Sequence, residues 1–179
     1  MARKVILFVA QTLDGYIAET DGNIDFLSDE DVAMGEIEDR EYDKMIRHID
    51  TVVMGRTTYD QVVNELSPDN YPYADFDNYI MTSHPLEDFD NVHFVNGDVV
   101  ELVQKLKEQP SRKDIWIVGG SKVISPLVTN NLVDIFRIGI VPVILGKGIP
   151  LFLDNVRHKG LNLKSVKKVN GIAYLEYQR

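Results

Sequence analysis

Cysteine is absent from the 179-residue sequence, which excludes disulfides, a thiolate metal site and a cysteine nucleophile. Basic residues are outnumbered, since 19 Lys and Arg stand against 28 Asp and Glu and give a formal net charge of −9. A nucleic-acid surface needs clustered Lys and Arg, so we expect no nucleic-acid partner. Long hydrophobic runs are also missing, and the apolar stretch 5–10 is too short for a signal core or a membrane span. We therefore expect a cytoplasmic protein that does not bind membranes.

Several catalytic patterns are missing as well. No Gly-x-Ser-x-Gly sequence occurs, so a hydrolase of that type has no nucleophile to build on. The run 146–148, Gly-Lys-Gly, is not followed by Ser or Thr and begins no helical pattern, which excludes a phosphate loop. The histidines stand singly, without the spacing of metal ligands on one helix face; they are His48, His84, His93 and His158. We expect no metal site.

What the sequence does contain is an apolar strand that runs directly into paired glycines. Residues 115–118 suit a buried strand, because branched and aromatic side chains fit a pleated surface. Gly119 and Gly120 then allow a close backbone approach, and Ser121 is a good cap for a helix that starts there. The free N–H groups and the dipole of such a helix favour an anion, with a nucleotide phosphate as the first candidate. The alternative is a tight turn with nothing bound.

The same pattern occurs at two other strand ends. The strand 52–54 meets Gly55 and then Arg56, a permanent cation. Thr57 or Thr58 is expected to cap the helix that follows. A third strand, 79–84, ends in small hydrogen-bonding residues, which are Thr82, Ser83 and His84. Because open α/β sheets bind nucleotides where their strands end, we expect one long ligand to lie across the three strand ends.

Strands and helices alternate along the chain, which then closes with strands alone. The expected strands are 4–11, 52–54, 79–84, 92–95, 115–118, 135–145, 161–169 and 172–177. The expected helices are 29–49, 57–66, 98–109 and one from 121. This order predicts an α/β protein with a mixed, mostly parallel central sheet covered by helices. Asn170-Gly171 predicts an antiparallel hairpin at the C-terminal end. With 44% hydrophobic residues and no linker, repeat or low-complexity tract, residues 1–179 are expected to form a single domain.

Two prolines leave local questions. Pro142 lies within the predicted strand 135–145 and implies that this strand is an edge or carries a bulge. Pro126 lies beyond the first turn of a helix that starts at Ser121, where it would remove a hydrogen bond. Either the helix includes Pro126, or Ser125 and Pro126 restart it as cap and first position.

Six short motifs follow one another along the chain: Leu13-Asp-Gly-Tyr-Ile-Ala, Val53-Met-Gly-Arg-Thr-Thr-Tyr, Ile80-Met-Thr-Ser, Ile115-Trp-Ile-Val-Gly-Gly, Leu132-Val-Asp and Pro142-Val-Ile-Leu-Gly-Lys-Gly. Their order and spacing resemble the dihydrofolate reductase-like superfamily. Within it, the chain is most similar to stand-alone relatives of the reductase domain of the bifunctional riboflavin-biosynthesis deaminase-reductase. The resemblance implies a three-layer fold with a central sheet of about eight strands, NADPH as cofactor, a small heterocyclic or sugar-like substrate, and a homodimer.

The resemblance also assigns roles to individual residues. Gly55, Arg56 and Thr57 match the phosphate-binding turn, in which Arg56 would meet the 2′-phosphate of NADP. Thr82, Ser83 and His84 match the segment beside the adenine ribose. The pyrophosphate turn is matched by Gly119, Gly120, Ser121 and Lys122. Ala10 and Ile17 match residues that contact the nicotinamide.

The substrate stays open, because the sequence departs from both branches of the superfamily. Riboflavin reductases carry a Glu directly before the glycine pair, where this sequence has Val118, and Arg47 lies one position away from their substrate-binding helix Arg. Dihydrofolate reductase needs a carboxylate on its first helix. The candidates here are Glu38 and Asp39, which fit a run of solvated acids equally well.

We therefore expect an NADPH-dependent reductase that transfers hydride to a small heterocyclic substrate. It would be of the riboflavin-biosynthesis reductase type (5-amino-6-(5-phosphoribosylamino)uracil reductase-like) or of the dihydrofolate reductase type. The substrate pocket is expected between Ala10 and Gln11, the loop 67–78, and Glu38 or Asp39, one of which would donate a proton directly or through water. The alternative is a non-catalytic NADP-binding or dimeric interaction protein on the same fold.

Overall fold

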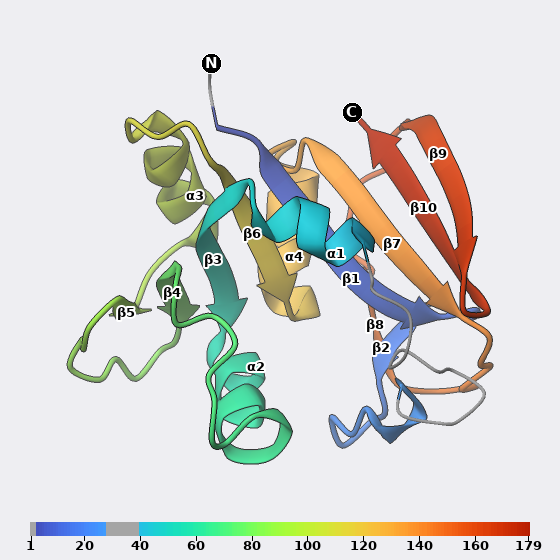
Figure 1. Ribbon diagram of the computed structural model, residues 1–179, viewed down its shortest axis with the longest axis horizontal. Coiled ribbons are helices and arrows are strands. Elements are labelled where there is room, and N and C mark those ends of the chain that lie inside the picture. The colour runs from blue at the N-terminus through green and yellow to red at the C-terminus, as the bar shows by residue number, and fades with distance from the viewer. Residues whose placement is uncertain (1–2, 28–39) are drawn as a thin grey trace.

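A computed structural model of the chain describes residues 3–27 and 40–179. Its main feature is an eight-stranded sheet with helices on both faces, shown in Figure 1. The strands are β1 (Val5–Thr12), β2 (Tyr16–Ala18), β3 (Ile49–Gly55), β4 (Asp77–Met81), β5 (Val92–Val95), β6 (Asp114–Gly119), β7 (Ile135–Val141), β8 (Ile149–Pro150), β9 (Asn162–Val169) and β10 (Ile172–Gln178). The α-helices are α1 (Arg40–Ile46), α2 (Arg56–Gln61), α3 (Val99–Glu108) and α4 (Ser121–Thr129), with a 3-10 turn at Asp25–Leu27 and a π-helical turn at Val62–Leu66.

The strands of the large sheet follow the order β5-β4-β3-β6-β1-β7-β10-β9. The first six in this order pair in parallel, whereas β10 runs antiparallel to β7 and β9 antiparallel to β10. The hairpin turns at Asn170 and Gly171, whose φ angles of 50° and 80° suit a two-residue hairpin turn. The expected mixed, mostly parallel sheet with a C-terminal antiparallel hairpin is confirmed.

One apolar cluster on each face of the sheet produces three layers. On one face, α3 and α4 pack against Ile117 of β6, with Ile124 of α4 fully buried. On the other face, Met45 of α1 and Tyr59 of α2 join a cluster around Trp116 of β6. Ile117 and Trp116 serve opposite faces because neighbouring side chains alternate along a strand. Figure 1 shows α1 in front of the sheet and α4 behind it, and the expected three-layer fold is confirmed.

The predicted helix 29–49 is described only at its C-terminal end. Residues 28–39 lie outside the described residues, and α1 ends at Ile46. The N–H of His48 donates to the carbonyl of Met45 at 2.9 Å, and Ile49 begins β3. The predicted end of this helix was therefore wrong. Ile49 continues the apolar period of the helix, yet it is buried as a strand residue.

The caps predicted for the two helices that start at Gly55 and Gly120 were wrong by one to three residues. The N-cap of α2 is Gly55 and that of α4 is Gly120, and neither makes a side-chain capping bond. Thr57 and Thr58 lie inside α2, and Ser121 is the first residue of α4. A glycine cap provides no side-chain acceptor for the first N–H groups of the helix, which stay available to another acceptor.

The structure answers the questions raised by Pro142, whose effect was misjudged from the sequence, and by Pro126, whose effect was left open. The strand predicted over 135–145 ends at Val141, so Pro142 follows its last pair. β7 lies between β1 and β10, and the inference of an edge or a bulge from Pro142 was wrong. α4 runs through Pro126 without a restart, and the hydroxyl of Ser125 accepts the N–H of Leu153 at 3.0 Å.

A second, two-stranded sheet joins β2 to β8 beside the carboxyl ends of the large sheet. The carboxylate of Asp14, in the turn before β2, accepts the N–H groups of Leu145 and Gly146 at 3.1 and 2.7 Å. The hydroxyl of Thr12 donates to the same carboxylate at 2.7 Å. These bonds tie the turn after β1 to the loop between β7 and β8. Ile17 of β2 and Ile149 of β8 thereby take fixed places.

Gly148→Ala tests the close packing of this small sheet. A Cβ atom on Gly148 would lie 2.3 Å from the carbonyl oxygen of Ala18 and 2.9 Å from Cδ2 of Leu145. The backbone contact cannot relax by a side-chain rotation, so we expect a loss of about 1–3 kcal/mol in the free energy of unfolding. Urea denaturation measures it, with Gly160→Ala as the control because a Cβ there meets nothing within 4 Å. Equal stability of the two variants would contradict the packing.

Asp14→Asn tests the turn through its pH dependence. The bond from the Thr12 hydroxyl, followed by the N–H groups of Leu145 and Gly146, lowers the pKa of Asp14 from 3.8 to about 2. Folding lowers this pKa, so the ionised Asp14 carboxylate adds to the free energy of unfolding. This contribution is complete above pH 3.8 and is lost as the pH falls through about 2.

The stability difference between wild type and Asp14→Asn is therefore expected to be constant near neutral pH and to shrink as the pH falls from about 4 to about 2. Urea unfolding across this range measures it. Asp154→Asn, at an exposed position outside the turn, serves as the control. A difference that does not change with pH would show that the Asp14 carboxylate is not bonded in this way.

Candidate functional site

A cleft of about 1640 Å³ opens at the edge of the sheet where the parallel strands end. β1, β3, β4 and β6 contribute their carboxyl ends to it, in the lower part of Figure 1. All the residues predicted to contact a cofactor line this cleft: Ala10, Ile17, Gly55, Arg56, Thr57, Thr82, Ser83, His84, Gly119, Gly120, Ser121 and Lys122. The parallel strand order brings together residues that lie as far apart in sequence as 10 and 122.

Two helix starts form the polar wall of the cleft. α2 begins directly after β3, and α4 begins directly after β6. Gly119 has a φ angle of 142°, which side chains rarely allow, and the peptide bond between Gly119 and Gly120 is cis. A Cβ atom on Gly120 would lie 3.8 Å from the hydroxyl of Thr58, so the two helix starts are close neighbours. Their first N–H groups make this wall suited to an anion.

The side chain of Ser121 is engaged in a hydrogen bond with the backbone of a β-strand. Its hydroxyl donates to the carbonyl of Pro150 in β8, and the residue is almost fully buried. This bond ties the start of α4 to the small β2–β8 sheet. Ser121 therefore borders the cleft as a structural contact, while the neighbouring Lys122 is exposed.

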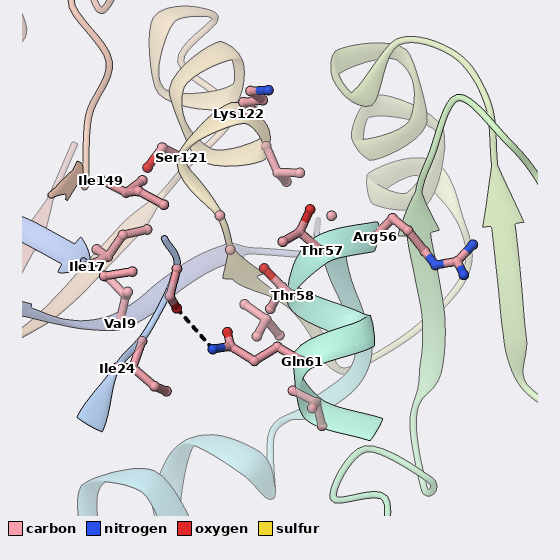
Figure 2. A pocket seen from close by; sticks show the side chains of 18 of the residues that line it. Val9, Ile17, Ile24, Arg56, Thr57, Thr58, Gln61, Ser121, Lys122 and Ile149 are labelled. Carbon is pink, nitrogen blue, oxygen red and sulfur yellow. Dashed lines mark hydrogen bonds between the residues drawn. The ribbon is translucent and has the colours of Figure 1, made fainter. Parts of the chain in front are cut away.

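Arg56 lies at the start of α2 and is held by two neighbours. Its Nε donates to the carboxylate of Asp60 at 2.6 Å, and its guanidinium carbon lies 5.6 Å from the ring centre of Phe94. About a third of the side chain stays exposed (34%), and the residue is part of the cleft lining. Figure 2 shows this side chain extending away from Ser121 and Lys122. The cleft thus has two separate places for anionic groups.

The segment after β4 completes this end of the cleft. The N–H of His84 donates to the hydroxyl of Thr82 at 3.1 Å, and Nδ1 of His84 lies 2.9 Å from the hydroxyl of Ser83. The chain is therefore folded back on itself directly after the strand. All three side chains are short or compact and line the cleft near Arg56.

The wall opposite α2 is apolar. Figure 2 shows Val9, Ile17, Ile24 and Ile149 gathered across from Thr57, Thr58 and Gln61. The side-chain amide of Gln61 donates to the carbonyl of Gly22 at 3.0 Å and so bridges the two walls. A flat apolar group of a ligand would make its contacts on one side of the cleft, and a polar group of the ligand would make its contacts on the other.

A group of aromatic rings forms the far end of the cleft, and the sequence did not reveal it. The rings of Phe8, Tyr42, Tyr73, Trp116 and Tyr174 line this end, and we call them the aromatic subsite. The ring centres of Tyr42 and Tyr73 lie 5.9 and 5.3 Å from that of Trp116, and those of Trp116 and Tyr174 both lie 6.4 Å from that of Phe8. They come from five separate segments of the chain, so no local pattern gave a signal. Burial raises the pKa of Tyr73 to about 12, which keeps its hydroxyl protonated.

Two asparagines hold the loop that carries Tyr73. The side-chain amide of Asn78, which is fully buried, donates to the carbonyls of Tyr73 and Phe76 at 2.9 and 2.6 Å. The side-chain amide of Asn91 donates to the carbonyls of Ala74 and Phe76. Of the predicted loop 67–78, Tyr73 is the residue that lines the cleft.

The remaining predicted site residues have different outcomes. Glu38 and Asp39, the candidate catalytic acids, lie outside the described residues. Gln11 precedes the end of β1 but does not line the cleft, whereas Ala10 does. Among residues 3–27 and 40–179, no three His, Asp or Glu side chains are grouped to hold a metal ion. Within the same ranges, no helix is long and apolar enough to cross a membrane.

Two solved structures resemble this chain along its whole length. One is a protein named for riboflavin biosynthesis from Shewanella sp. PV-4, with a TM-score of 0.84 and 29% identity, covering 100% of this chain and 99% of that one. The other is dihydrofolate reductase from Enterococcus faecalis, solved with NADP(H), with a TM-score of 0.63 and 16% identity over 100% of this chain and 99% of that one. The second likeness is one of fold alone.

Sequence comparison gives the family directly. YwjB, an uncharacterized protein of Bacillus subtilis (strain 168), is 36% identical over 181 residues, covering 100% of this chain and 99% of that protein. The family model described as the RibD C-terminal domain matches residues 3–172. The match covers nearly the whole chain and agrees with the dihydrofolate reductase-like fold, so this protein belongs to the RibD C-terminal domain family.

Proposed function

We propose that this protein is an NADPH-dependent reductase of a small heterocyclic substrate. The observation that carries the proposal is the convergence of twelve separately predicted cofactor residues on one cleft at the carboxyl edge of the sheet. Open α/β sheets bind nucleotides at this edge. Membership in the RibD C-terminal domain family and the NADP(H) complex of the Enterococcus faecalis reductase, which has the same fold, support the same assignment.

The cleft fits the parts of NADPH in their order along the molecule. The glycine-capped start of α4, at Gly120, suits the pyrophosphate, because helix N–H groups attract anions there. Arg56 suits the 2′-phosphate, since a guanidinium matches phosphate oxygens in charge and shape. The segment 82–84 follows β4, the neighbour of β3, and lines the same cleft, where the adenine ribose would bind. The apolar wall with Ile17 suits the nicotinamide ring, beside Ala10 of β1.

In this proposal, the residues of the chain position the reactants and exclude water. NADPH, when bound, supplies the hydride. Ala10 and Ile17 would hold one face of the nicotinamide, which leaves the other face open to the aromatic subsite. Glu38 and Asp39 remain our candidates for donating the accompanying proton, directly or through water.

Arg56→Ala is expected to weaken NADPH binding by about 1.5 kcal/mol, the lower end for a hydrogen bond to a charged group, because the side chain is partly exposed. NADH lacks the 2′-phosphate, so its affinity is expected to change little. Fluorescence titration of the reduced nicotinamide measures both. Arg157→Ala removes a comparable charge at an exposed position outside the cleft and serves as the control. An equal loss for the two cofactors would contradict the role of Arg56.

Turnover tests the reductase assignment itself. Oxidation of NADPH is followed with dihydrofolate, the ribosylaminopyrimidine of riboflavin biosynthesis, and simple quinones or imines as acceptors. We expect at least one of them to be reduced. Tight binding of NADPH without oxidation by any acceptor would contradict the assignment and favour a non-catalytic NADP-binding protein.

We also propose that the protein forms a homodimer through the C-terminal hairpin. β9 is the edge strand of the sheet, and it leaves Leu163 and Val166 exposed by 54% and 61%. They lie opposite Tyr177 and Leu175 of β10, which makes an apolar strip at an unpaired edge.

Light scattering at micromolar concentration is expected to give twice the chain mass of 20.4 kDa. Val166→Glu is expected to give monomers, because it places a charge in the apolar strip. Lys168→Glu, at an exposed position of the same strand, is expected to leave the dimer intact. A monomer mass for the wild type would reject this proposal.

A further inference from the structure

The aromatic subsite stands beside the place proposed for the nicotinamide. In the sheet, Ala10 of β1 is aligned with Gly139 of β7, and Gly139 with Tyr174 of β10. Gly139 presents no side chain, and a Cβ atom there would lie 3.3 Å from the ring of Tyr174. The floor of the subsite is therefore flat at the level of Ala10. A ring lying on it would adjoin the nicotinamide.

The rings around this floor offer a planar ligand contact on several sides. The rings of Phe8 and Tyr174 are nearly parallel, with an interplanar angle of 7°, while Tyr73 meets Trp116 edge-on at 82°. Aromatic faces and edges stabilise a stacked or edge-on ring beyond the effect of buried area. The Trp116 indole N–H already donates to the carbonyl of Phe8 at 3.2 Å. The polar groups that these rings bring to a ligand are tyrosine hydroxyls.

The described cations that line the cleft lie away from the aromatic subsite. Among the lining residues that the structure describes, Lys and Arg occur only as Lys122 and Arg56. Arg56 lies over Phe94 of β5, and the strand order puts four strand spacings, roughly 19 Å, between β5 and β1. Lys122 is on α4, which packs against the face of the sheet opposite to Trp116.

Three further cations whose side chains the structure describes lie near the subsite without lining it. Arg137, next to Phe8 in the sheet, is paired with Glu176 at 2.8 Å. Lys167 lies opposite Tyr174 on the edge strand and is outside the cleft lining, and Arg47 is exposed and also outside it. A phosphate carried into the aromatic subsite would have no cation among the described lining residues, and an unpaired buried anion is strongly unfavourable.

We propose that the substrate of this reductase is an unphosphorylated, uncharged planar ring with a conjugated C=O or C=N acceptor. The inference rests on the proposed NADPH-dependent function. Hydride from NADPH and a proton from water add across the conjugated acceptor, which is thereby reduced by two electrons, and NADPH becomes NADP⁺. The hydroxyl of Tyr73, which lines the subsite and whose pKa burial raises to about 12, stays protonated and donates a hydrogen bond to the oxygen or nitrogen of the acceptor.

Fluorescence of Trp116 reports binding to this subsite directly, because it is the single tryptophan of the chain. The protein, alone and with saturating NADP⁺, is titrated with menadione and with the ribosylaminopyrimidine of riboflavin biosynthesis, with and without its 5′-phosphate. The pyrimidine pair differs in the phosphate alone, and free tryptophan amide corrects for light absorption by the ligands. We expect menadione or the unphosphorylated pyrimidine to change the fluorescence, and the unphosphorylated pyrimidine to bind at least tenfold more tightly than its phosphate.

Two results would overturn the inference. One is an affinity for the phosphorylated pyrimidine that equals or exceeds that of its unphosphorylated counterpart. The other is a Trp116 signal that no ring compound changes. Binding of NADPH is followed separately by nicotinamide fluorescence, so a failure of the proposed cofactor function is distinguished from a failure of the ring subsite.

Variants at the subsite provide the second test. Tyr73→Ala removes one aromatic wall and is expected to weaken ring binding about fivefold to tenfold, with NADPH affinity unchanged. Tyr73→Phe keeps the wall without the hydroxyl and is expected to restore most of this loss. Tyr79→Ala is the control, because Tyr79 packs with the cluster on the α3 and α4 face and does not line the cleft. Ring affinity that is unchanged in a folded Tyr73→Ala protein, as judged by urea denaturation, would contradict the subsite.

Discussion

The parallel pairing of β3, β6 and β1 with their neighbouring strands brings the strand-end residues of the cleft to one edge of the sheet. In this register, Gly55 is aligned with Met81 of β4, and Met54 with Gly119 of β6, so the chain leaves neighbouring strands at one level. Two strands continue directly into helices capped by glycine, which brings their first N–H groups to the same edge. A shift of one residue in this register would exchange the faces of the side chains and separate these groups.

The two ends of the resulting cleft differ in the chemical groups that they offer to a ligand. The end near Arg56 and Lys122 combines fixed charge with helix starts, as a dinucleotide requires. The other end, the aromatic subsite, is lined by aromatic rings and has tyrosine hydroxyls as its polar groups. The β2–β8 sheet, held by Asp14 and by the bond from Ser121, keeps the apolar wall with Ile17 in place between them. The charged groups of a ligand and a flat ring would thus bind in separate parts of one continuous cleft.

Local signals in the sequence were sufficient for the sheet, the hairpin at Asn170-Gly171 and the set of residues at the strand ends. They were insufficient wherever tertiary contacts decided the outcome. Ile49 fits the period of a helix but is buried in a strand, and Pro142 falls just after the last pair of a central strand. The aromatic subsite gave no signal, because strand order alone brings Phe8 near Trp116 and Tyr174. The single-domain assignment and the roles of Glu38 and Asp39 stay predictions.

If NADPH lies across the carboxyl edge of the sheet, a crystal structure of the protein with NADP⁺ will show it there. We expect the pyrophosphate at the start of α4 beside Gly119 and Gly120, the 2′-phosphate at Arg56, and the nicotinamide against Ala10 and Ile17. The substrate face of the nicotinamide would then be open toward Trp116 and Tyr174. A cofactor bound elsewhere, or bound in this cleft with the nicotinamide at the Arg56 end, would contradict the account.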